Sequence, residues 1–93
     1  MHILLVQYHL HIPDALSLKD KRQVMKPLLN ELRRDFNISA AEVDDHDLWQ
    51  SAVIATVAVS NLRDALERSE REVTDRLEAN GHVQISQIQR EWL

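Results

Sequence analysis

Apolar and polar residues alternate along the first part of the chain, as in an extended strand with two different faces. The pattern predicts a strand over residues 2–12, whose second face begins with Ile3 and Leu5 and then becomes polar. Pro13 ends the run, because proline has no amide hydrogen to donate to a neighbouring strand. The residues of the apolar face are Leu4, Val6, Tyr8, Leu10 and Ile12.

A helical repeat follows, from residue 18 to about residue 36. Ser17 and Asp20 have the spacing of a capping box, so we expect the helix to begin at Leu18. Pro27 lies inside this helix and removes one backbone hydrogen bond, so we expect a kink over residues 23–26. The apolar arc consists of Leu18, Val24, Met25, Leu28, Leu29, Leu32 and Phe36.

The next apolar segments predict a short strand over residues 38–43 and a longer one over residues 49–60. Both faces of the longer strand carry small aliphatic residues, which is typical of a central strand covered on two sides. A polar connection, Asp44-Asp45-His46-Asp47, joins the two strands.

A second helix and a last strand complete the chain. We expect Asn61 to cap the start of the helix, whose apolar spine is Leu62, Leu66, Val73 and Leu77. Gly81 is expected in a left-handed C-terminal cap. The last strand begins near Val83, and a change of phase at Ile88 and Trp92 predicts a bulge or the end of the strand.

The order strand, helix, strand, strand, helix, strand predicts an α+β domain over residues 1–93 with the ferredoxin-like βαββαβ fold. Its four-stranded antiparallel sheet has the order 4-1-3-2, with both helices on one face. The helix-free face carries Ile3, Leu5 and small aliphatic residues, and exposed patches of this kind usually mark interaction surfaces. We therefore expect a homo-oligomer, with a dimer favoured; the alternative is an ordinary scatter of surface aliphatic residues.

The composition restricts the function further. The 93 residues carry a formal charge of −4, which argues against a generic polyanion binder and leaves room only for a local basic patch. The chain has no cysteine, which excludes disulfides and thiol nucleophiles. No apolar run is long enough for a bilayer, and the first residues lack a signal-peptide pattern, so we expect a cytoplasmic protein with no membrane partner.

Five segments carry a family resemblance: LHIP (10–13), SLKDKR (17–22), FNISAAEV (36–43), DLWQ (47–50) and VSN (59–61). In collinear order they resemble the YlxP-like family of small uncharacterised bacterial proteins. The resemblance implies a ferredoxin-like fold, a bacterial cytoplasmic setting and, from the usual gene neighbourhood, a loose association with translation and ribosome maturation. It implies no catalytic or ligand-binding residue. The chain departs from the family pattern at Pro27, at His9 and in its more polar second helix.

Charge is distributed unevenly over the first helix. Lys19, Arg22, Lys26 and Arg33 share one flank, while the acidic residues lie on the other. This flank is a candidate surface for phosphates of RNA or ribosomal particles; the alternative is a solvated helix flank. Lys21 points into the apolar arc, where its stem either snorkels past the core edge or its amine meets a buried anionic partner or ligand.

Aromatic residues do not support base stacking on the sheet, because Tyr8 points to the helix side and the third strand has only Trp49 at its entrance. No DNA-readout motif is present. Trp49 is interpreted either as an anchor that packs the hairpin onto the body or as a partner contact. The candidate interface residues are therefore Ile3, Leu5 and Trp49.

Metal binding and catalysis receive weak support. His9 and His11, with Asp44, Asp45, His46 and Asp47, suggest a metal-assisted hydrolase as an alternative function. The alternative is that these are exposed polar residues and a solvated turn. Glu42 and Asp44 lie on one face of the predicted strand by its two-residue period, which suggests paired carboxylates for acid–base catalysis; the alternative is that both face the solvent. We expect no catalytic residue, no cofactor and no metal. The favoured function is a self-associating accessory binding protein, with a purely structural oligomer as a further alternative.

Overall fold

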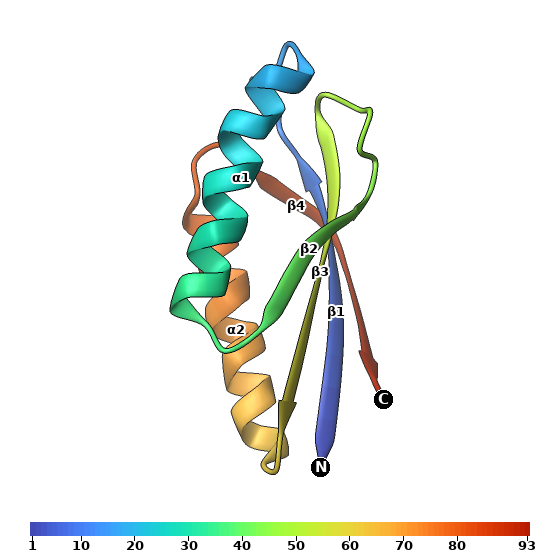
Figure 1. Ribbon diagram of the computed structural model, residues 1–93, viewed down its shortest axis with the longest axis vertical. Helices are drawn as coiled ribbons and strands as arrows, with labels where there is room; N and C mark the ends of the chain where they lie inside the picture. The colour runs from blue at the N-terminus through green and yellow to red at the C-terminus, as the bar shows by residue number, and fades with distance from the viewer.

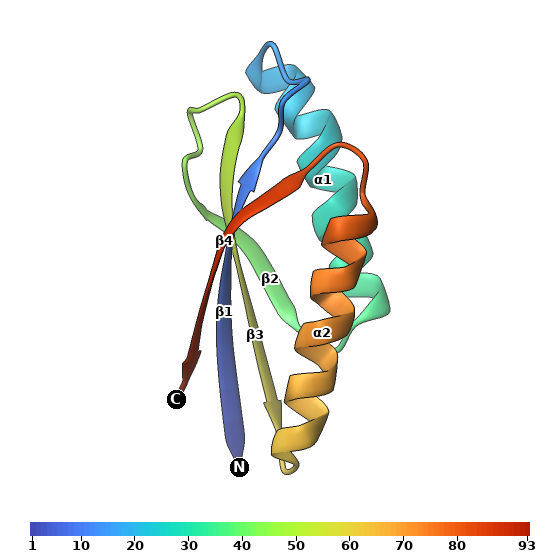
Figure 2. The ribbon, with the colours of Figure 1, turned by 180° about the vertical axis from the view of Figure 1, so that it is seen from behind.

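Six elements follow one another in the predicted order in the computed structural model, which describes residues 1–93. They are β1 (His2–His11), α1 (Leu18–Asp35), β2 (Ser39–Asp44), β3 (Ser51–Ser60), α2 (Arg63–Ala79) and β4 (Gln84–Trp92). The strands form one antiparallel sheet in the order β2-β3-β1-β4, and both helices cover the same face (Figures 1 and 2). The ferredoxin-like α+β fold and its strand order are confirmed.

The core lies between the sheet and the helix layer. The alternate residues of β1 that the sequence assigns to the apolar face are all buried, and they pack with Leu32 of α1 and Leu77 of α2. Tyr8 is fully buried at the centre, where its hydroxyl lies 3.0 Å from Thr74 Oγ1. Burial raises the pKa of Tyr8, so the phenol stays protonated.

α1 begins where the capping residues predict. The Ser17 hydroxyl accepts a hydrogen bond from the Asp20 amide at 3.0 Å, and the Asp20 carboxylate accepts one from the Leu16 amide. The helix continues through the exposed Pro27 without interruption and ends at Asp35.

The ends of α2 differ from the prediction. The N-cap residue is Leu62 rather than Asn61, and no side chain caps the helix there. The left-handed conformation expected for Gly81 is wrong, because no glycine in the chain has a positive φ. Asn80 ends the helix in an extended conformation with φ −77° and ψ 117°. The Asn80 side-chain oxygen accepts a hydrogen bond from the His82 amide at 2.8 Å, and this turn forms without a positive φ at Gly81.

The predicted bulge in β4 is confirmed. The pairing of β1 with β4 shifts between His9 and Leu10, whose partners are Gln87 and Ile85. Ser86 lies at this bulge and its hydroxyl donates to the His9 carbonyl at 3.1 Å. The shift keeps Ile85 and Ile88 on the helix side of the sheet, opposite Leu10 and Tyr8.

The acidic flank of α1 faces α2 and is held there by Arg76. One guanidinium nitrogen of Arg76 lies 2.9 Å from Glu31 Oε1 and 2.7 Å from Asp35 Oδ2. Arg34 also binds the Asp35 carboxylate, at 2.8 Å. Hydrogen bonds from Arg34 and Arg76 hold the pKa of Asp35 well below its usual value of 3.8.

Replacing Arg76 with glutamine should therefore destabilise the protein most at neutral pH. A carboxylate with a lowered folded-state pKa contributes stability above its unfolded pKa, and that contribution is lost as the pH falls. The stability difference between the Arg76→Gln variant and wild type should shrink as the pH falls below about 4. Urea unfolding at a series of pH values measures it. Arg68→Gln is the control, because Arg68 contacts no carboxylate. A difference that is constant with pH would contradict the prediction.

Candidate nucleic-acid interface

Three exposed cations, Lys19, Arg22 and Lys26, form a row on α1 that we call the basic stripe. Their spacing of three and four residues places them on one face of the helix, over about 10 Å of its length. No side-chain hydrogen bond or ion pair within the chain involves their charged groups. The acidic flank of the same helix faces α2, so the stripe side of α1 is positive.

Most other cations are bound within the molecule. Arg34, Arg63, Arg76 and Arg90 each contact a carboxylate, Lys21 contacts a carboxylate and a carbonyl, and Arg33 contacts a carbonyl. Only Arg68 and Arg71, exposed on α2, resemble the basic stripe in having no such partner. Free positive charge is therefore concentrated in the first half of α1.

Lys21, one of the predicted anion-binding residues, lies inside the molecule. Its side chain is only 3% exposed, and its amine lies 2.8 Å from Glu42 Oε2. The amine also donates to the carbonyl oxygen of Asp45 at 2.7 Å. Snorkelling past the core edge is thus the wrong interpretation, and the alternative of a buried anionic partner is the one observed. Because this amine is buried, it is not accessible to an external anion.

Arg33 also has a partner within the chain. Its Nε and Nη2 atoms both donate to the carbonyl oxygen of Ala40, at 2.9 and 2.7 Å. This fork joins the last turns of α1 to β2, just as Lys21 joins the first turns of α1 to Glu42 at the other end of the strand. Of the five cations predicted to bind anions, two fix β2 beneath α1 and three remain free.

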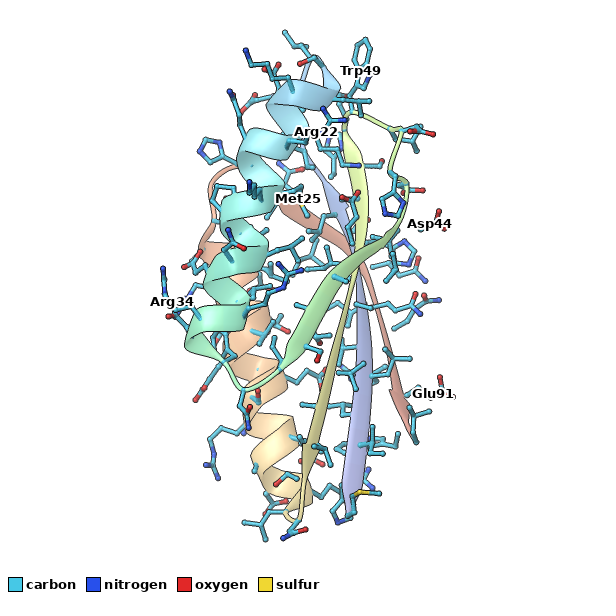
Figure 3. All side chains as sticks on the ribbon, in the orientation of Figure 1. Arg22, Met25, Arg34, Asp44, Trp49 and Glu91 are labelled. Atoms are coloured by element: carbon cyan, nitrogen blue, oxygen red, sulfur yellow. The ribbon has the colours of Figure 1, made fainter.

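Trp49 lies at the end of the molecule where α1 begins, on the same side as Arg22 (Figure 3). Its side chain is 53% exposed, and the neighbouring Leu48 and Leu16 are also more than half exposed. The exposure contradicts a role for Trp49 as a packed anchor. Figure 1 shows the N-terminus at the opposite end, two residues before Ile3, so the predicted interface residues Ile3, Leu5 and Trp49 do not form one surface.

Gln50 is a structurally important residue that the sequence analysis missed. Its side-chain amide donates to the carbonyls of Pro13 at 3.1 Å and Ala15 at 3.0 Å. Its own carbonyl accepts from the Ile12 amide at 2.9 Å. These bonds join the β1–α1 and β2–β3 connections and hold Trp49 near the start of α1. The pattern Trp-Gln at a strand entrance carries no signal of this role.

The helix-free face of the sheet, which we call the free face, is apolar at the end near the termini. Ile3 pairs with Val59, and Leu5 pairs with Val57, so four apolar side chains are adjacent on this face. The Leu93 amide donates to the Ile3 carbonyl at 2.9 Å, which extends the apolar row to the other side of β1. Val59 is 57% exposed and Val57 is 39% exposed.

The opposite end of the free face is polar and carries the two histidines. His9 Nε2 lies 3.2 Å from Gln89 Oε1, and His11 Nδ1 lies 3.0 Å from the carbonyl oxygen of Gln50. No three side chains of His, Asp or Glu come together in a group suited to a metal ion. His9 and Asp44 lie on either side of Val53 on this face.

Glu42 and Asp44 do not form a pair on one face, and the prediction from period two is wrong. The pairing of β2 with β3 shifts between them, so Glu42 is opposite Ile54 and Asp44 is opposite the adjacent residue, Val53. Glu42 consequently lies on the helix side, against Lys21, while Asp44 lies on the free face (Figure 3). The bulge responsible leaves no mark in the sequence.

The fold and these surfaces define a small ferredoxin-like protein with an exposed cationic helix and an open sheet face. Residues 3–90 match the family described as "Protein of unknown function (DUF503)". The chain is 32% identical over 81 residues to "Uncharacterized protein YlxP" of Bacillus subtilis (strain 168), which covers 87% of this chain and 88% of that protein. The chain therefore belongs to this family, and the resemblance noted in the sequence is confirmed. None of its helices is long and apolar enough to cross a membrane.

Proposed function

We propose that the protein is a non-enzymatic accessory binding protein of the bacterial cytoplasm. It self-associates and contacts RNA or ribosomal particles through the basic stripe. One observation carries the RNA part: Lys19, Arg22 and Lys26 are exposed without an internal partner, whereas most other cations of this acidic chain are bound to carboxylates or carbonyls.

The position of the stripe in α1 supports a function in binding. Positive side chains near a helix N-terminus oppose the helix macrodipole and lower helix stability. Lys19 is the second residue of α1, and Arg22 lies in the next turn. Residues that break a local stability rule without an internal gain tend to occur at functional sites. Anion binding at the same end of the helix would remove this cost.

Recognition through the helix differs from base stacking on a sheet. Tyr8, the one tyrosine of β1, is buried against the helices and presents no ring on the free face. Contacts from lysine and arginine to phosphates contribute affinity without sequence specificity. They weaken as the salt concentration rises, because the release of counterions from the RNA then gains less free energy. We therefore expect binding that depends on salt and tolerates changes of RNA sequence.

Self-association is supported by the apolar end of the free face, where Val57 and Val59 are exposed beside Ile3 and Leu5. A purely structural oligomer would share this feature. The two functions differ in one result, because a structural oligomer predicts no salt-dependent retention on RNA or ribosomes.

The test uses two probes: a fluorescent single-stranded RNA of about 20 nucleotides and purified bacterial ribosomal particles. Three phosphate contacts predict a slope of about −2 for log affinity against log salt, so RNA binding should weaken about 20-fold between about 50 and 200 mM salt. Changing all three stripe residues to glutamine should reduce the slope to near zero. Fluorescence anisotropy measures RNA binding, and co-sedimentation measures retention on ribosomal particles.

A matched control carries Arg34→Gln, Arg68→Gln and Arg71→Gln, which remove the same charge from exposed positions outside the stripe. This control should keep most of the wild-type affinity. The proposal fails if wild type binds neither probe, or if the stripe variant and the control lose binding equally.

A further inference from the structure

We propose that two copies of the chain pack their free faces against each other around a two-fold axis. Ile3, Leu5, Val57, Val59 and Leu93 form the apolar part of this interface. The inference names the partner and the surface of the proposed self-association, and it rests on that part of the proposed function.

The first argument is the continuity of the apolar surface. Antiparallel pairing places Ile3 beside Val59 and Leu5 beside Val57, where side chains on one face are about 5 Å apart. Leu93 extends the first row across β1 and is mostly exposed. The patch spans three neighbouring segments of the sheet rather than scattered positions. At this end the central strands β1 and β3 carry only apolar residues on the free face, and the polar residues Glu91 and Ser39 lie on the flanking strands, beside Leu5 and Val57.

The second argument is the depletion of charge. Lysine, arginine, aspartate and glutamate make up 28% of the chain, yet the register places no lysine or arginine on the free face. Its only carboxylates are Asp44 and Glu91, which point away from the helix layer (Figure 3). Depletion of charged residues distinguishes the centre of protein interfaces from the remaining surface.

The polar end of the free face also suits a second copy. It carries the glutamines Gln7, Gln84, Gln87 and Gln89. A glutamine amide offers both donors and an acceptor, so glutamines related by a two-fold axis can bond to one another. A lysine or arginine close to the two-fold axis would meet its own like charge, which would oppose association. The face is therefore compatible with itself, as a two-fold interface requires.

The available area is sufficient for a reversible dimer. Four strands about 4.8 Å apart, with the longest ten residues long, give a face of about 600 Å² in projection. Two such faces bury about 1,200 Å², at the lower end of the range for specific interfaces. We therefore expect a dimer whose population depends on concentration.

This arrangement leaves α1 and α2 on the outside of both copies, because they cover the other face of each sheet (Figures 1 and 2). Each dimer then presents two basic stripes on opposite sides. A ribosomal particle or a long RNA could contact both, and the second contact would gain from the high effective concentration of a linked site.

The test measures the molar mass of the wild-type chain by light scattering and its self-association by analytical ultracentrifugation. At high concentration the mass should approach twice the 10.8 kDa of one chain. Val59→Lys places a charge at the most exposed of the four apolar positions on β1 and β3 and should raise the dissociation constant at least tenfold. Leu16→Lys is the control, because Leu16 is an exposed leucine away from the free face and should leave the dimer intact.

Circular dichroism checks that both variants fold, and Val59→Thr provides a milder change at the same position that should weaken the dimer less than Val59→Lys. The inference is overturned if wild type stays at 10.8 kDa at all concentrations, or if Val59→Lys dimerises as wild type does. The second result, with a wild-type dimer, would leave self-association standing and reject this face. Dimerisation of the glutamine variant of the basic stripe should be unchanged, so failure of RNA binding is distinguishable from failure of the dimer.

Discussion

Replacing Lys21 with methionine should lower the free energy of unfolding by about 3 kcal/mol, because it leaves a largely buried carboxylate without its counter-charge. The Glu42 side chain is 19% exposed, and the Lys21 amine is the cation at its buried oxygen Oε2. The two atoms are 2.8 Å apart, and Oε2 has no hydrogen-bond partner in the protein. The charge of Lys21 is therefore what stabilises this buried oxygen. The substitution also removes the donor to the Asp45 carbonyl. The partial exposure of Glu42 places the expected loss at the lower end of the range for broken buried pairs.

A double-mutant cycle in urea separates the ion pair from the packing. Lys21→Met combined with Glu42→Leu should recover most of the lost stability, because apolar pairs of similar volume replace buried ion pairs at little cost. Lys26→Met is the control for adding a methionine to the same helix, since Lys26 is exposed and unpaired. A loss below about 1 kcal/mol for Lys21→Met, or a double variant no more stable than Lys21→Met alone, would contradict the prediction.

Lys21 also illustrates where inference from the sequence stopped. The helical repeat correctly placed its side chain within the apolar arc, and a buried partner was one of the two interpretations left open. Selecting the partner required knowing that Glu42 faces the helix layer. That orientation follows from the pairing of Ala40 and Glu42 with Thr56 and Ile54 of β3, which the local sequence does not give. Periodicity fixes the direction of a side chain within its own element, but not what lies opposite.

The fold was predictable because it depends on patterns within each element. The alternation in β1, the capping residues Ser17 and Asp20 and the apolar spines of both helices are local properties. Each agreed with the architecture except at Leu62, which precedes α2 and is exposed. The basic stripe was likewise visible, because exposed positions on one helix face follow from spacing alone. Arg33 was not separable from the stripe, since its partner is a backbone carbonyl on β2, which carries no side-chain signature.

Only part of the free face could be predicted from the sequence. Ile3 and Leu5 were identified from the alternation of β1, but their neighbours Val57, Val59 and Leu93 follow only once the register of three segments is known. Trp49 was grouped with them because one of its two interpretations was a partner contact, although it lies at the other end of the molecule (Figure 3). Exposure alone cannot assign residues to the same surface; register and topology can.

Pro27 gives the second large effect, in the opposite direction. Replacing it with alanine should raise the free energy of unfolding by about 2 kcal/mol. Proline in a helix interior costs about 3 kcal/mol relative to alanine, and up to about 1 kcal/mol of this is offset because proline restricts the unfolded chain. Pro27 is exposed in the middle of α1, so its removal costs no core contact. The alanine amide would also restore a hydrogen bond to the carbonyl of Gln23, which is exposed on the same helix.

Thermal unfolding measures this gain, which should appear as an increase of about 10 °C in Tm for a domain of this size. Asn30→Ala is the matched control, because Asn30 is exposed one turn further along and its replacement improves helix propensity by only about 0.6 kcal/mol. Equal gains in the two variants, or a loss in Pro27→Ala, would show that the helix accommodates the proline without cost. Pro27 follows Lys26 of the basic stripe directly. A stabilised Pro27→Ala variant that binds RNA more weakly than wild type would therefore indicate that the proline is retained to shape this surface.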